Sequence, residues 1–115
     1  MPDCIFCRII KGEVPAAIVR RNDRILALRD VNPQAPVHVL VIPTTHIGAA
    51  RDARGPEGER LLGELVAFAT QTATELGLDP KGYRLVVNTG DDGGQTVSHL
   101  HLHLLGGRQM AWPPG

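Results

Sequence analysis

The chain has 115 residues, enough for one domain that buries roughly two thirds of the surface of its unfolded form. Twelve basic and twelve acidic side chains give a formal net charge of zero, so no excess charge attracts a nucleic-acid polymer. No segment is apolar for long enough to cross a bilayer, and the first eleven residues lack the pattern of a secretory signal. We therefore expect a single cytoplasmic domain, residues 1–115, that binds a small ligand and neither a nucleic-acid polymer nor a membrane.

The spacing of apolar residues predicts an α+β domain. Helical periodicity indicates a first helix over residues 4–11 and a long helix over residues 56–78. Runs of β-branched and aliphatic residues predict five strands, over residues 18–21, 25–30, 37–42, 83–88 and 97–105. Because the strands run hairpin-wise before and after the long helix, without βαβ alternation, we expect a mainly antiparallel sheet.

The last predicted strand alternates histidine with leucine. Neighbouring side chains of a strand point to opposite faces, so His99, His101 and His103 share one face while the leucines anchor the other to the core. His99 and His103 lie about 13 Å apart on such a strand, which leaves the central His101 as the nucleophile or base. We expect the three imidazoles to line an open groove.

Two other interpretations of the histidine row stay open. One is a polar strand face without chemistry, which three alternating histidines make the weaker interpretation. The other is a catalytic metal site, because histidines at i and i+2 can share a metal. Catalytic zinc sites usually add a carboxylate ligand or base, and the row contains none.

A glycine-rich loop, residues 90–96, precedes the histidine row. Its Asp-Gly and Gly-Gly pairs are typical of a hairpin turn. Its position favours a second interpretation, a backbone nest for phosphate oxygens, with side-chain donors from Gln95 and Thr96. His38 lies in an apolar strand, where a hydrogen-bonded core histidine is the more typical role, and His46 falls in a predicted surface loop.

Both cysteines lie in one short motif, Cys4-x-x-Cys7. They are too close together to close a large loop. In a chain without a secretory signal, this spacing indicates a metal-binding pair or a redox pair before it indicates a structural disulfide.

On these residues, the chain resembles the histidine triad (HIT) superfamily. The segment from His99 to Leu105 fits the signature His-φ-His-φ-His-φ-φ, in which φ is apolar. The resemblance covers nearly the whole chain, through Ile9-Ile10, residues 33–38, residues 41–43, Asn88 and residues 93–96. The tail from Gly106 to Gly115 resembles the Hint branch, the purine nucleotide phosphoramidate hydrolases.

The resemblance implies the HIT fold, a five-stranded antiparallel sheet with two helices, and a homodimer that joins two such sheets. It also implies hydrolysis of the P–N bond of purine nucleoside 5′-phosphoramidates of the AMP type. A covalent nucleotidyl-histidine intermediate forms as the amine leaves, and water then releases the nucleoside monophosphate. The chemistry requires no metal. The nucleophilic imidazole must be neutral, with one nitrogen free and the other holding its proton against an acceptor.

Roles for individual residues follow from the same resemblance. The nucleophile is His101, with support from His38, His99 and His103. Phosphate contacts and orientation of the nucleophile are expected from Asn88, Gly94, Gln95 and Thr96. The ribose hydroxyls are expected at Asp30, and the base pocket at Ile5, Phe6, Ile9, Leu28 and Val31.

A structural zinc site is a further implication, because bacterial members of the superfamily carry the cysteine pair. The expected ligands are Cys4, Cys7, His46 and His99. Two thiolates and two imidazoles suit tetrahedral zinc, and free thiols on the first helix are the alternative. A zinc-bound His99 could not also protonate the leaving group, so His103 or a water would take that role.

Three positions bear on specificity. His103 stands where a sister branch of transferases has Gln, which favours water as the final acceptor. Ala111 and Ser98 depart from the Hint pattern, which often has a histidine near the Trp and an aromatic residue, respectively. Because the tail is expected to reach the partner subunit's site, these departures affect the preference for a leaving group.

Three competing functions stay open. The first is a dinucleoside polyphosphate hydrolase with the same nucleophile, and the Hint-like tail argues against it. The second is a non-catalytic nucleotide-binding or scaffold protein, and the intact His101, His38 and Asn88 argue against it. The third is a zinc-dependent hydrolase, which chelator-sensitive turnover would reveal.

Overall fold

The computed structural model describes residues 4–115, so residues 1–3 of the predicted domain lie outside the described part. The helices are α1 (Ile5–Ile10), the short 3-10 helix η1 (Ala50–Asp52) and α2 (Gly55–Glu75). The strands are β1 (Ile18–Arg21), β2 (Ile25–Arg29), β3 (Val37–Pro43), β4 (Tyr83–Val87) and β5 (Leu102–Gly106). Within residues 4–115, no helix combines the length and the apolar character that crossing a membrane requires.

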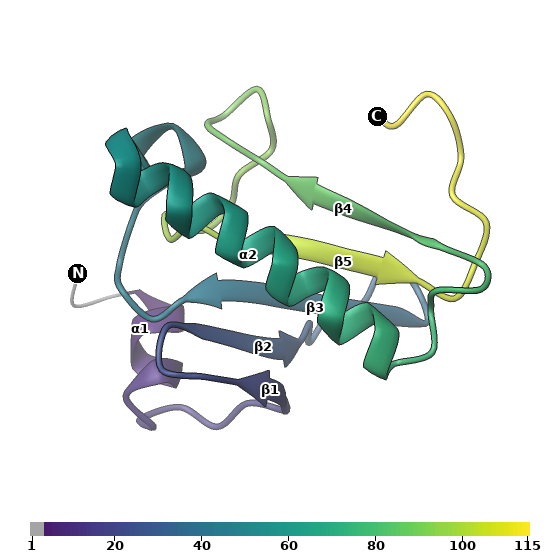
Figure 1. Cartoon of the computed structure of the whole chain (residues 1–115), viewed down its shortest axis with the longest axis horizontal. Helices are drawn as coiled ribbons and strands as arrows, with labels where there is room; N and C mark the ends of the chain where they lie inside the picture. The colour runs from purple at the N-terminus through teal and green to yellow at the C-terminus, as the bar shows by residue number, and fades with distance from the viewer. Residues whose placement is uncertain (1–3) are drawn as a thin grey trace.

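The five strands form one sheet in the order β1-β2-β3-β5-β4, with every neighbouring pair antiparallel (Figure 1). This confirms the predicted α+β class and the five-stranded antiparallel sheet with two α-helices. Strands β3 and β5, which come from distant parts of the chain, lie side by side in the middle. Residues from both strands therefore meet on each face of the sheet.

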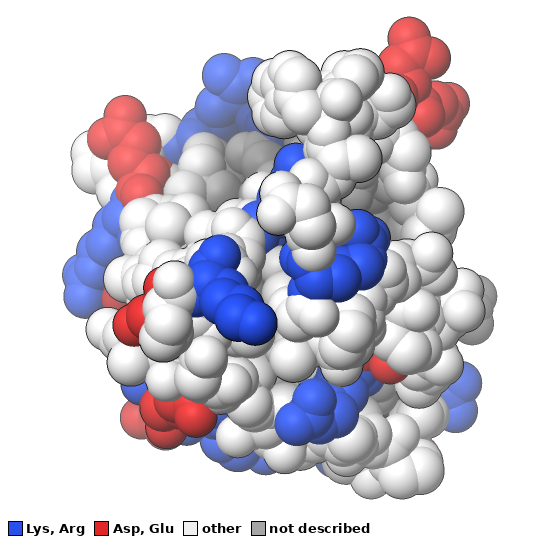
Figure 2. Space-filling model, turned by 90° about the vertical axis from the view of Figure 1, so that its right-hand side faces the viewer, with Lys and Arg blue, Asp and Glu red and all other residues white. Residues whose placement is uncertain are grey.

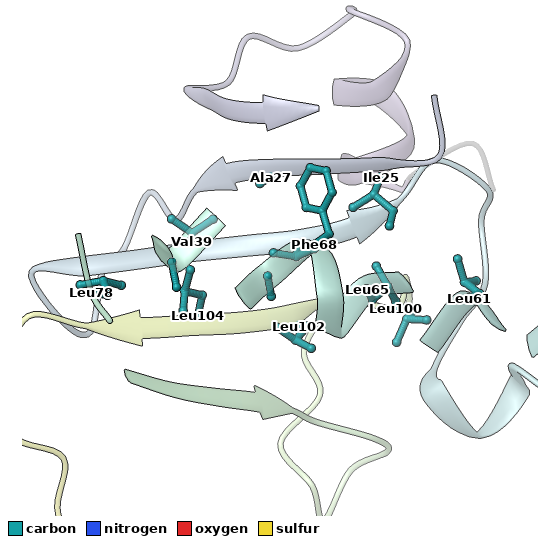
Figure 3. Close-up of a cluster of buried hydrophobic side chains, with 13 residues drawn as sticks. Ile25, Ala27, Val39, Leu61, Leu65, Phe68, Leu78, Leu100, Leu102 and Leu104 are labelled. Atoms are coloured by element: carbon teal, nitrogen blue, oxygen red, sulfur yellow. The ribbon is translucent and has the colours of Figure 1, made fainter. Parts of the chain in front are cut away.

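Helix α2 crosses one face of the sheet, and the main apolar core lies between them (Figures 1 and 3). On β2 and β3 the odd-numbered Ile25, Ala27, Val39 and Val41 join this core. Their even-numbered neighbours, such as Leu26 and Leu40, pack instead in a second cluster with Phe6 of α1. Because α1 and α2 cover opposite faces, the central strands are buried on both sides and read as continuous apolar runs.

The last strand is shorter than the sequence predicts. β5 begins at Leu102, and residues 97–101 form bends and extended backbone outside the sheet. The amide of Leu100 donates to the carbonyl of Ile47, 2.6 Å away, instead of joining a ladder. The predicted alternation on one open face is therefore wrong for this segment, and His99 is fully buried rather than in a groove. The leucine side of the prediction is confirmed, because Leu100, Leu102 and Leu104 all reach the core under α2.

Candidate active site and metal cluster

His101 lies one residue before β5, and its ring is held by the backbone two residues earlier. Its Nδ1 is 2.7 Å from the carbonyl oxygen of His99. A carbonyl can only accept, so Nδ1 carries the proton and the lone pair of the neutral ring is on Nε2. His101 is buried, with 6% of its surface exposed, and its Nε2 has no hydrogen-bond partner among the described residues. The lone pair on Nε2 is therefore unengaged, as a nucleophile or a base requires.

His38 and His103 form a hydrogen-bonded pair beside His101. His38 is on β3, His103 is on β5, and the His38 Nε2 lies 2.9 Å from the His103 Nδ1. The backbone amide of Gln34 donates to the other nitrogen of His38, Nδ1, at 3.0 Å. The proton of neutral His38 must therefore be on Nε2, which donates to His103 and also lies 3.3 Å from the Asp30 carboxylate. His103 accepts at Nδ1 and so presents its own N–H at Nε2.

Burial keeps this pair neutral. It lowers the pKa of His103 to about 4, and the neighbouring His101 and His38 act in the same direction. Burial also lowers the pKa of His38, although the Asp30 carboxylate partly opposes the shift. The rings of His101 and His103 have centroids 5.1 Å apart. A neutral imidazole with its N–H at Nε2 thus lies beside the His101 ring near pH 7.

A second cluster brings together Cys4, Cys7, His46 and His99, the four residues expected to bind zinc. The Nδ1 of His99 lies 3.3 Å from the Cys4 Sγ, 3.6 Å from the Cys7 Sγ and 3.1 Å from the His46 Nδ1. The Cys7 Sγ lies 3.2 Å from the His46 Nδ1. Tetrahedral zinc, with bonds of about 2.3 Å to sulfur and about 2.0–2.1 Å to nitrogen, places its ligand atoms about 3.3–3.8 Å apart. The four residues therefore fit a zinc ion.

Two chemical features of the cluster also suit a cation. The Nε2 of His99 lies 3.0 Å from the carbonyl of Pro43, so it donates there and leaves a lone pair on Nδ1, inside the cluster. Burial and then the adjacent Cys4 thiol raise the pKa of the Cys7 thiol. Two neighbouring thiolates are costly without a positive ion to neutralise them.

The two ring nitrogens of His99 are thus both engaged, Nε2 by the Pro43 carbonyl and Nδ1 by the cluster. His99 is connected to His101 through its backbone carbonyl. Phe6 of α1 packs edge-on against both rings, with centroids 5.6 Å from His99 and 5.3 Å from His101. This placement of His99 agrees with the expectation that a zinc ligand does not protonate the leaving group.

An apolar cavity of about 540 Å³ lies between α1 and the sheet. It is lined by all five residues expected at the base pocket, Ile5, Phe6, Ile9, Leu28 and Val31, and by Asp30. Sequence reasoning missed other wall residues, Val14, Pro15, Ala16, Ala17, Arg29, Leu40 and Val97. Strand alternation could have found Leu40, because it follows His38 by two residues on the same face of β3.

The glycine-rich loop is tied mainly to itself. The Asn88 side chain donates to the carbonyl of Gly93 at 2.7 Å. The Gln95 amide group donates to the carbonyls of Gly48 and Val97 and accepts from the Gly90 amide. Gln95 therefore holds the loop in shape and joins it to the β3–α2 connection, instead of offering a free donor. Gly94 has a φ of +79°, which a residue with a side chain rarely adopts.

Comparisons with known proteins agree with this architecture. The family model described as HIT domain matches residues 11–110. A crystal structure of a HIT family hydrolase from Legionella pneumophila Philadelphia 1 is 50% identical, with a TM-score of 0.94, and the match covers 98% of this chain and 100% of that chain. The chain belongs to the HIT family, which its sheet order and histidine segment already indicated.

Two further relatives bear on ligands. A 14 kDa zinc-binding protein of Zea mays is 48% identical over 112 residues, and the match covers 96% of this chain and 87% of the Zea mays protein. The structure of a histidine triad nucleotide-binding protein from Candida albicans is 30% identical, with a TM-score of 0.81, covering 96% of this chain and 83% of that chain.

Proposed function

We propose that this protein is a hydrolase that cleaves the P–N bond of purine nucleoside 5′-phosphoramidates through a covalent nucleotidyl-His101 intermediate. The observation that carries the proposal is the His101 ring, whose Nδ1–H is held by the His99 carbonyl so that Nε2 is free. The similarity to the hydrolase from Legionella pneumophila supports a hydrolytic reaction, and the similarity to the nucleotide-binding protein from Candida albicans supports a nucleotide ligand.

The reaction takes two displacements at phosphorus. The lone pair of the His101 Nε2 attacks, a P–N bond to His101 forms, and the bond to the amine breaks. The amine departs with a proton taken from a water, and the neutral His103 donates a hydrogen bond from its one N–H to that water without giving up the proton. The hydroxide that remains attacks the nucleotidyl-His101 phosphorus, the bond to His101 breaks, and the nucleoside monophosphate leaves.

The nucleotide is held by the apolar cavity and the loop beside it. A volume of about 540 Å³ is typical of a small-molecule pocket, and its apolar walls suit a purine ring. Asp30 at its rim is the proposed partner of the ribose hydroxyls. Asn88, Gly94 and Thr96 are the proposed phosphate neighbours, with Gln95 keeping the loop in shape.

Zinc and a second subunit complete the proposal. Cys4, Cys7, His46 and His99 would hold a zinc ion that cross-links α1, the β3–α2 connection and the segment before β5. The ion supplies structural stabilisation, and the chemistry belongs to His101. The homodimer is proposed along β4, since β4 is an edge strand of the sheet and its last residue, Val87, is 43% exposed.

The test is the initial rate of hydrolysis of an adenosine 5′-phosphoramidate that carries a fluorescent amine. We expect turnover by the wild-type protein and none by His101→Ala, with unchanged thermal unfolding of the variant as the control for folding. Diadenosine polyphosphate serves as the competing substrate. AMP binding without amine release would contradict the proposal and favour a scaffold, and faster polyphosphate cleavage would favour the dinucleoside hydrolase.

A further inference from the structure

Arg108 lies two residues beyond β5, outside the proposed active site, and two nitrogens of its guanidinium donate to the same carbonyl oxygen. Its Nε and Nη2 donate to the carbonyl of Gln34 at 3.2 and 3.1 Å, and its Nη1 donates to the carbonyl of Gln109. Two donors from one planar group fix the direction of the carbonyl as well as its position.

The surroundings of Arg108 leave it no acidic partner. Figure 2 shows basic side chains gathered in the middle of this face and acidic ones toward its rim. A shallow hollow here is lined by Lys81, Arg84 and Arg108, and within residues 4–115 none of the three pairs with a carboxylate. The guanidinium of Arg108 is therefore committed to backbone carbonyls, chiefly that of Gln34.

Gln34 is the residue whose amide sets the tautomer of His38. While its N–H points at the His38 Nδ1, the proton of His38 must be on Nε2, and His103 must present its proton at Nε2. The Asp30 carboxylate, 3.3 Å from the His38 Nε2, favours the same tautomer, so loss of the amide would mix two tautomers. In the second tautomer, His38 carries its proton on Nδ1 and turns an acceptor toward His103. His103 would then place its proton on Nδ1, and the donor beside His101 would be lost.

The loop that carries Gln34 has few other anchors. Residues 31–34 are exposed, and the buried residue next to them is Ala35. Side-chain contacts join Asp30, Asn32 and Gln34 to one another, and His38 of β3 contacts the Asp30 carboxylate and the Gln34 amide. The tail packs closely on the far end of the loop, because a Cβ on Gly107 would lie 2.8 Å from the Pro36 Cβ. Among the described residues, Arg108 is thus the side chain other than His38 that hydrogen-bonds this loop from outside it.

We propose that Arg108 is a positioning residue for the histidine pair, and that it acts through the backbone of Gln34 to hold His38 and His103 in one tautomer. The tautomer part of this inference stands on the geometry alone. Its kinetic consequence rests on the proposed hydrolase function.

The experiment compares Arg108→Ala and Arg108→Lys with a matched control, Arg84→Ala. The Arg84 guanidinium also donates to a tail carbonyl, that of Ala111, but has no link to Gln34. The first readout is the ring ¹⁵N NMR spectrum of His38 and His103, which separates the two tautomers. The second is kcat and KM for an adenosine 5′-phosphoramidate, with thermal unfolding to check that each variant folds.

We expect Arg108→Ala to mix the tautomers of His38 and to lower kcat about tenfold, with a smaller change in KM. Arg108→Lys should show smaller changes in the tautomers and in kcat than Arg108→Ala, since an ammonium can donate one hydrogen bond to the same carbonyl but not the two that the guanidinium donates. Arg84→Ala should resemble wild type. Unchanged ring spectra in Arg108→Ala would overturn the proposal, as would equal effects of Arg84→Ala. If the wild-type protein has no turnover, the proposed function fails and the spectra still decide the role of Arg108.

Discussion

Residues 4–115 contain two clusters of metal-ligating side chains whose chemistry differs. One joins Cys4, Cys7, His46 and His99, the other joins Asp30, His38 and His103, and in each the donor atoms lie within 4.8 Å of one another. The difference comes from the backbone group behind each histidine. The Pro43 carbonyl takes the proton of His99 and turns a lone pair into the first cluster. The Gln34 amide occupies the lone pair of His38 and turns a proton into the second.

This contrast shows how a fold separates metal binding from proton transfer when both use histidine. A backbone acceptor prepares an imidazole as a ligand, and a backbone donor prepares it as a hydrogen-bond donor. His101 also has a backbone acceptor, because the His99 carbonyl accepts the proton on its Nδ1. Its lone pair, on Nε2, is left for the proposed substrate and not for a metal cluster. Side-chain identity and distance alone would not distinguish the three cases.

The largest expected effect comes from removing zinc. The first cluster should bind one zinc ion per chain, and Cys4→Ser should lose it, because a serine hydroxyl is a poor replacement for a thiolate. At a free zinc concentration of 1,000 times Kd, binding to the folded state adds about 4 kcal/mol to the free energy of unfolding. Metal analysis and chemical denaturation, with and without a chelator, measure both effects.

The second cluster supplies the control for zinc. Asp30→Asn alters a cluster of similar size, and its zinc content should equal that of wild type. If Cys4→Ser retained one zinc per chain, or if Asp30→Asn lost it, the assignment of zinc to the first cluster would be wrong.

The next effect concerns the hydrogen-bond donor. His103→Gln removes the imidazole N–H that stabilises the hydroxide formed when the leaving amine takes its proton from water. We expect kcat for an adenosine 5′-phosphoramidate to fall about 100-fold, with zinc content unchanged. A substrate with a more acidic amine needs less help from a proton donor, so it should lose less. An equal loss for both amines would indicate that His103 does not act on the leaving group.

The smallest effect is on stability at mildly acidic pH. Burial in the folded protein lowers the pKa of His103 to about 4, below the usual value of 6.5 for a histidine. Between these values the unfolded chain binds more protons than the folded one, so the free energy of unfolding falls as the pH drops from 6.5 toward 4. Urea unfolding of the zinc-loaded protein at several pH values measures this slope. His103→Gln should flatten it, and an unchanged slope would assign it to other groups.

Periodicity was a reliable guide to most of the fold. Strand β1 has the predicted bounds, and helix α2 differs from its prediction by one residue at the start and three at the end. The prediction failed between Val97 and His101, where the histidine–leucine alternation continues although the sheet hydrogen bonds do not. Alternation of apolar and polar residues indicates which side chains are buried. A segment that buries every second side chain beside the sheet has the same alternation as a strand within it.

The candidate site was predictable to a similar degree. The expected base-pocket residues line one cavity, and the four expected zinc ligands meet, because both sets came with a resemblance that spans nearly the whole chain. Gln95 was expected to contact phosphate, but its side-chain amide donates to the carbonyls of Gly48 and Val97 instead. No local sequence pattern could place these carbonyls next to it. Arg108 was only one basic residue in a glycine-rich tail until the fold brought it to Gln34.

Local periodicity and motifs are sufficient to predict the elements, the family and the residues that can perform the chemistry. The nitrogen that carries the proton of each histidine is set by the fold instead. It depends on backbone groups, and two of them belong to other segments, the Pro43 carbonyl beside His99 and the Gln34 amide beside His38. The division into a metal ligand, a hydrogen-bond donor and a nucleophile is therefore a property of the fold, because distant backbone supplies the partners that fix each ring.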